Sequence, residues 1–214
     1  MGGKRVGLAR TQKLIQNLKR ELQMSGSKLR DMNINAKRHD WSGNGLQSGS
    51  IGVPRTMVQE YGDEIITTFQ IDLQNLSGSS TAGEVIGVHN ATTGSESYAY
   101  MFQWYTAVNG VCYKVDLACI EAPAGGAANA HFELSSSTLN VFEHGDTPSG
   151  DPTGIVDFTS NISGNQVIAK DQIDNSPGNQ EYIYLVAGTG TAAASAGQYT
   201  AGKLVIKFYS YKSF

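Results

Sequence analysis

From about residue 63 onward the chain alternates apolar and polar positions in short runs, with turn-forming residues between the runs. Because successive side chains of a strand point to opposite faces, this alternation predicts strands that bury one face. In residues 203–211, for example, Leu204, Ile206 and Phe208 share one face. The expected strands are residues 65–73, 84–89, 98–105, 111–120, 131–134, 138–142, 155–158, 166–170, 181–187 and 203–211.

No helical period of useful length interrupts these runs, so we expect the strands to pair antiparallel. Short strands between Gly, Ser and Asn turns predict a mostly β fold, an antiparallel sandwich with a jelly-roll-like or related arrangement. One predicted strand is rich in aromatic residues: Tyr98, Tyr100, Phe102, Trp104 and Tyr105. Either alternate rings fill the core, or they form a stacking platform for a glycan.

The N-terminal segment has a helical period instead. Thr11 can cap a helix in which Leu14, Ile15, Leu18 and Leu22 form one apolar stripe, and Ser25-Gly26 ends it. A helix of this length is marginal in water when isolated, so the stripe is expected to dock on a protein surface.

A Gly-, Ser- and Asn-rich stretch after Trp41 reads as a linker. We therefore place a basic helical arm and linker at residues 1–50, and a β-sandwich domain at residues 51–214. A tryptophan in a linker is not expected to stay in water, so Trp41 is predicted to anchor on a surface.

Charge separates the two parts more sharply than hydropathy does. Residues 1–38 contain ten Lys or Arg and two acids, whereas residues 39–214 contain six Lys or Arg and seventeen acids. The net charges are thus +8 and −11, so arms and acidic bodies of neighbouring subunits attract each other. Only 16% of all residues are charged, which suits a surface that packs against other subunits.

Three interpretations of the basic arm stay open. Its cations contact nucleic-acid phosphates, its amphipathic helix docks on a groove of a partner subunit, or the helix packs on its own domain. Leucines interleaved with Lys and Arg, without aromatic residues, favour docking on protein.

Other motifs do not predict chemistry. Residues 197–203 match a phosphate-binding loop, but Leu204 stands where Ser or Thr would hold Mg²⁺, and a strand pattern follows. His39, His89, His131 and His144 lack metal-ligand spacing. A Ca²⁺ site among Asp146, Asp151, Asp171 and Asp174 lacks regularly spaced ligands. We expect no catalytic residue, metal or cofactor.

Cys112 and Cys119 fall in one predicted strand at an odd spacing, which predicts that they point to opposite faces and do not bridge each other. Both are expected to be small buried hydrophobic residues. No apolar run is long enough to span a membrane.

Two stretches carry a resemblance. The opening KRVGLARTQKLIQNLKREL (residues 4–22) and the ending YTAGKLVIKFYSY (residues 199–211) resemble virion structural proteins of marine tailed phages, cyanophage-like ones in particular. The resemblance implies a non-enzymatic virion component, such as a capsid decoration (cement) protein, assembled in the host cytoplasm.

These observations lead to one hypothesis and one alternative. The chain is expected to self-associate, as a trimer or another homo-oligomer, and to bind capsid subunits through its arm and Trp41; the alternative is a receptor- or glycan-binding tail or fibre protein. The residues expected to contact the partner are Lys4, Arg5, Arg10, Lys13, Leu14, Ile15, Leu18, Lys19, Arg20, Leu22 and Trp41.

Overall fold

The computed structural model describes most of the chain beyond residue 53 and two short segments before it. The described residues are 37–39, 42–46, 54–89, 97–125, 131–148, 153–158, 162, 164–170, 172–188 and 197–213. In these residues the chain forms strands, one 3₁₀ turn η1 (Asn44–Leu46) and one short helix α2 (Thr106–Asn109). No helix of the described residues is both long and apolar enough to cross a membrane.

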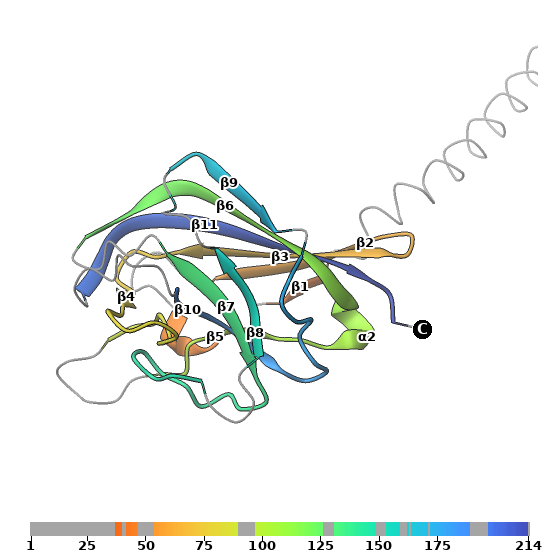
Figure 1. Ribbon diagram of the computed structural model, residues 1–214, viewed down its shortest axis with the longest axis horizontal. Coiled ribbons are helices and arrows are strands. Elements are labelled where there is room, and N and C mark those ends of the chain that lie inside the picture. The colour runs from red at the N-terminus through yellow and green to blue at the C-terminus, as the bar shows by residue number, and fades with distance from the viewer. Residues whose placement is uncertain are drawn as a thin grey trace, which may run out of the picture.

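Seven strands form a large antiparallel sheet (Figure 1). Its order is β1-β2-β3-β11-β6-β9, with β4 paired to one end of β11. Two long strands, β6 and β11, run side by side through its centre. The bounds are β1 (Lys37–His39), β2 (Arg55–Tyr61), β3 (Glu64–Asp72), β4 (Ser77–Gly78), β6 (Val111–Gly125), β9 (Gln166–Lys170) and β11 (Gly197–Tyr211).

Four further strands form a second, smaller antiparallel sheet of order β5-β10-β7-β8. Their bounds are β5 (Tyr100–Gln103), β7 (Phe132–Ser137), β8 (Thr153–Phe158) and β10 (Tyr182–Ala187). In Figure 1 the small sheet lies below the large one, an arrangement consistent with a β-sandwich. The prediction of a mostly antiparallel β fold is thus confirmed.

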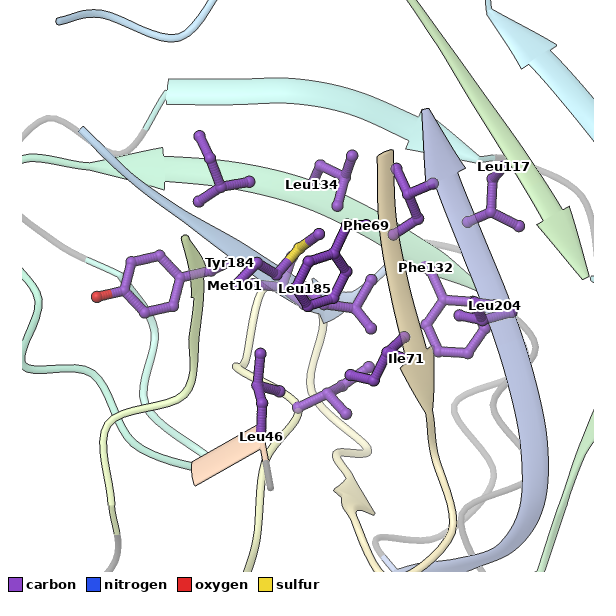
Figure 2. Packing of buried hydrophobic residues seen from close by; sticks show 14 of the residues in the cluster. Leu46, Phe69, Ile71, Met101, Leu117, Phe132, Leu134, Tyr184, Leu185 and Leu204 are labelled. Carbon is purple, nitrogen blue, oxygen red and sulfur yellow. The ribbon is translucent and has the colours of Figure 1, made fainter. Parts of the chain in front are cut away.

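One apolar core lies between the two sheets. Leu204, Ile206 and Phe208 of β11 are buried, as their alternation predicts. Phe208 contacts Phe102 and Trp104 edge-to-face, with ring centroids 5.6 and 5.5 Å apart, and so joins β11 to β5 and the residues after it. Figure 2 shows side chains from both sheets meeting in this layer: Phe69, Ile71 and Leu204 from the large sheet, and Met101, Leu134 and Leu185 from the small one.

The two cysteines do not point to opposite faces. Both are buried and both belong to the core, at 4% and 1% exposure for Cys112 and Cys119. The register of β6 against β11 shifts because Tyr209 pairs with Lys114 while Ser210 pairs with Cys112, which leaves Tyr113 as an extra residue. This β-bulge reverses the alternation between the cysteines, so the prediction from spacing is wrong. The predictions that they are buried and unbridged are confirmed.

Most predicted strands appear with shifted ends, but two do not form. Residues 84–89 make only isolated bridges, Ser77 with Gly87 and Val85 with Val186, and residues 138–142 lie outside any strand. Conversely, β2 lies inside the predicted domain but is not among the expected strands, the first of which begins at residue 65. Its inward side chains Thr56 and Val58 are 2% exposed, so its buried face is short and half polar, which weakens the sequence signal.

Parts of the predicted arm pack on the β domain. Lys37–His39 pairs with β2, and Leu46 is fully buried in the core. The amide of Gly43 donates to the carbonyl of Tyr100 and that of Gly45 to the carbonyl of Tyr98, so residues 42–46 lie alongside the β5 segment. Packed structure therefore begins earlier than residue 51. Residues 1–36 and Trp41, with the predicted helix, lie outside the described residues.

Candidate interaction surface

The residues predicted to bind a partner are not among those that the structure describes. These are Lys4, Arg5, Arg10, Lys13, Leu14, Ile15, Leu18, Lys19, Arg20, Leu22 and Trp41. What the structure does place is the point at which their segment joins the body. That point is β1, which pairs with β2 in the large sheet.

The outer face of the large sheet, opposite the core, exposes apolar side chains. Nine large hydrophobic side chains are exposed in the described residues, and six of them lie on strands of this sheet. They are Met57, Tyr61, Val111, Ile120, Val167 and Tyr211. Concentration of exposed apolar groups on one face is typical of a surface that contacts another molecule.

Tyrosines gather at one end of this outer face. Strand pairing aligns Tyr61, Glu64 and Tyr211 in one row across β2, β3 and β11, where directly paired residues share a face. Tyr113, the bulge residue, stacks on Tyr211 with ring centroids 4.7 Å apart and an interplanar angle of 18°. We call Tyr61, Glu64, Tyr113, Tyr209 and Tyr211 the tyrosine face.

A carboxylate lies within this group of rings. The hydroxyl of Tyr113 donates a 2.5 Å hydrogen bond to Oε1 of Glu64. This bond is the main reason why the pKa of Tyr113 is raised well above its ordinary value. Tyr61 and Tyr211, on either side of Glu64, are 38% and 55% exposed, so rings next to a carboxylate are open to a ligand.

The tyrosine face already holds one cation. The ammonium group of Lys114 lies 5.0 Å from the centre of the Tyr209 ring and 3.4 Å from Asp116. Burial, followed by a hydrogen bond with Asp116, raises the pKa of Tyr209, which therefore stays neutral. Rings and carboxylates together form a surface that suits cations.

The opposite end of the outer face has a different character. Lys203 pairs with Glu121 at 2.5 Å and lies 3.8 Å from Asp72, a charge network that links three strands. Toward the same end Ile120 on β6 and Val167 on the edge strand β9 are 58% and 66% exposed. This end therefore combines ion pairs with an apolar edge.

Charge divides the body into two halves. All six Lys and Arg beyond residue 39 lie on the large sheet or directly after it: Arg55, Lys114, Lys170, Lys203, Lys207 and Lys212. The described residues of the small sheet and its loops include no Lys or Arg, but they carry these acids: Glu84, Glu133, Glu143, Asp146, Asp157, Asp174 and Glu181. Burial, followed by Asp157 and Asp174, raises the pKa of Glu133. The excess negative charge of the described body thus lies away from the large sheet.

The aromatic segment around β5 is not a platform. Trp104 is fully buried, and its Nε1–H donates a 3.0 Å hydrogen bond to the carbonyl of Gly110. Phe102 is 3% exposed, which leaves only Tyr98 of this segment exposed, at 45%. Alternate rings fill the core, so this segment does not support the glycan hypothesis.

A small polar pocket brings together two of the histidines. His89 and His144 meet edge-to-face with ring centroids 5.2 Å apart, and with Ser77, Gly197 and Gln198 they line a volume of about 360 Å³. In the residues that the structure describes, no group of three or more His, Cys, Asp or Glu is arranged to hold a metal ion. The run resembling a phosphate-binding loop lies in β11, without the helix that such a loop requires.

Comparisons of the chain with known proteins gave no match. No family model matches the chain, and neither do any curated proteins or solved structures. The function is therefore argued from the arrangement of its residues.

Proposed function

We propose that this protein is a structural subunit of a virion, a capsid-associated decoration protein that binds shell subunits through its basic N-terminal arm. The body is a jelly-roll-like sandwich, and the arm is an amphipathic helix. The observation that carries the proposal is the attachment of the arm's segment, at β1, to the large sheet, whose outer face bears most of the exposed apolar side chains. The strand at which the arm joins the body and the apolar outer face thus belong to the same sheet.

Apolar contacts provide most of the binding energy in this proposal. Burial of an exposed aliphatic side chain contributes about 1.5–3 kcal/mol, so Leu14, Ile15, Leu18 and Leu22 together contribute several kcal/mol. An exposed ion pair contributes about 0–1 kcal/mol. The cations of the arm therefore speed and orient docking on an acidic shell, while the stripe of leucines holds it.

The distribution of charge over the body is consistent with a decoration protein on the outside of a particle. The half formed by the small sheet carries only acids in its described residues, and such a surface keeps particles apart in solution. The large sheet is electrically balanced beyond residue 39, with six cations and these six acids on its strands and turns: Glu60, Asp63, Glu64, Asp72, Asp116 and Glu121. A balanced, partly apolar face loses less solvation on contact and is the side expected to meet the shell.

Sedimentation of particles tests the proposal directly. Virions purified from the source of the protein should contain it in a fixed ratio to the major shell subunit, measured by quantitative mass spectrometry. Nuclease treatment of opened particles should leave it on the shell. Loss with the nucleic acid would assign the arm to phosphates, and absence from particles would reject the virion role.

Light scattering on the full chain and on residues 37–214 tests the role of the arm; this truncation keeps β1. If the shortened protein keeps its oligomer, the body self-associates and the arm is available to a different partner. If the shortened protein is monomeric, the arm joins identical subunits, and the decoration proposal loses its main support.

A further inference from the structure

The tyrosine face has a feature that the proposed function does not explain: open rings around a carboxylate, in the sheet that the basic segment joins at β1. We propose that the segment directly before β1, residues 28–36, folds over the tyrosine face of its own chain, with Lys28 or Arg30 over the Tyr61 and Tyr211 rings beside Glu64. We call this contact the clamp. It holds residues 28–36 against the body and so fixes where the N-terminal arm leaves it.

The direction of β1 brings the segment to this end of the sheet. Lys37 pairs with Val58 and His39 with Thr56, so the chain before Lys37 runs toward the end of β2 at which Tyr61 lies. Tyr61 is in turn paired with Glu64, and Glu64 with Tyr211. The chain therefore enters β1 at Lys37 from the side of the tyrosine end, whereas Val167 and Ile120 lie across the sheet, on β9 and β6.

The segment is long enough to cover the face. From β1 to β11 there are three strand spacings, which is about 14 Å at ~4.8 Å each. The seven residue steps from Arg30 to Lys37, the start of β1, span up to about 24 Å when extended. A tether this short also gives a high effective concentration, which favours the same chain over a second copy.

Charge complementarity indicates which ligand the face takes. At the tyrosine end Glu60, Asp63 and Glu64 outnumber Lys114 and Lys212 by one, while Asp116 is balanced by Lys207, its partner in the strand ladder. Residues 28–36 bring two cations, Lys28 and Arg30, against one acid, Asp31. Within the tyrosine face, Lys114 over Tyr209 shows the geometry that a guanidinium or ammonium group would repeat over Tyr211.

The inference goes beyond the proposed function and does not depend on it. The clamp uses only residues of one chain, so it holds whether residues 4–22 bind a shell or another partner. Its experiment uses the isolated full-length protein, so its failure is distinguishable from absence of the protein from virions.

Photo-crosslinking on the full chain tests the clamp. A p-benzoylphenylalanine at Val111, which pairs with Tyr211 and is 48% exposed, leaves every member of the tyrosine face in place. Mass spectrometry is expected to find crosslinks from this probe to residues 28–36. A matched probe at Val167, also exposed on the outer face, should not reach that segment. A second probe at Tyr61 repeats the test if the first variant does not fold.

Isotope labelling identifies the chain that supplies the segment. In a mixture of heavy and light protein, crosslinks should join peptides of the same label. Mixed-label crosslinks would show that a second copy occupies the face, and crosslinks only to residues 4–22, or to no N-terminal residue, would reject the clamp as well. The double change Lys28→Gln and Arg30→Gln should lower the crosslink yield several-fold, whereas Lys19→Gln should not; equal yields would overturn the role of the cations.

Discussion

Nδ2 of Asn109 donates a 3.0 Å hydrogen bond to Oγ1 of Thr67, and both side chains are buried. Asn109 ends α2, the short helix that leads from β5 of the small sheet to β6 of the large one. Its Oδ1 also accepts a 2.9 Å hydrogen bond from the backbone amide of Tyr105, at the start of α2. One amide group thus closes the helix and ties the connection between the sheets to β3.

Asn109→Ala is expected to lower the free energy of unfolding by about 1–3 kcal/mol, because the Thr67 hydroxyl and the Tyr105 amide lose their partner inside the protein. Asn179→Ala is the matched control, since Asn179 accepts similar bonds from Thr106 at an exposed position. Urea denaturation of both variants measures the difference. Equal losses of unfolding free energy would show that the buried hydrogen bonds of Asn109 stabilise the protein no more than the exposed ones of Asn179.

Gly110→Ala is expected to destabilise the protein far more than Gly62→Ala. Gly110 has φ 74° and ψ −162°, a region open almost only to glycine, and a Cβ there would lie 2.3 Å from the Tyr211 carbonyl oxygen. Gly62 also has a positive φ, 66°, but a Cβ there would have open space. We expect a loss of at least about 3 kcal/mol at Gly110 and about 1–2 kcal/mol at Gly62 in thermal or urea unfolding. Similar losses of stability at the two glycines would contradict the close approach of the Tyr211 carbonyl, on β11, to Gly110.

The stability of the protein should fall between about pH 9 and pH 11 because of Cys112. Burial raises the pKa of this thiol from its ordinary 9.0 to about 11 in the folded protein. In that interval the unfolded chain loses the thiol proton while the folded protein keeps it, so unfolding becomes easier as pH rises. The expected slope is at most about 1.4 kcal/mol per pH unit.

The Cys112→Ala variant separates this thiol from other groups. It should be less stable than the parent at pH 7, because it leaves a small cavity, but its stability should fall less between pH 9 and pH 10. Urea denaturation at several pH values measures both slopes. Parallel slopes for parent and variant would show that the Cys112 thiol is not responsible.

Leu18→Asp is expected to release the protein from its particle more completely than Lys19→Ala does. The first change places a charge in the apolar stripe of the arm, whereas the second removes one exposed cation. Sedimentation of particles mixed with each variant, followed by quantification of the bound fraction, measures the order. The reverse order would mean that charge, not the apolar stripe, holds the arm.

The local pattern of the chain predicts most strands. The alternation of Leu204, Ile206 and Phe208 is enough to identify β11 and its buried face, because a strand that covers a core needs an apolar residue at every second position. Residues 84–89 show where local pattern fails: they are apolar because Val85 and Ile86 fill the core from a loop, without a continuous ladder. An apolar run therefore indicates that a segment is buried, but not whether it is a strand or a loop.

The sequence by itself determined the strand-rich fold class, the burial of both cysteines and the basic N-terminal segment, since all three follow from composition and neighbouring residues. Only the tertiary structure decided the bulge at Tyr113, the early start of the body at β1 and the tyrosine face. Tyr61, Tyr113 and Tyr211 are far apart in the chain, and each reads locally as an ordinary outward residue. They become a surface because strand order and register, which depend on long-range pairing, place β2, β3, β11 and β6 side by side.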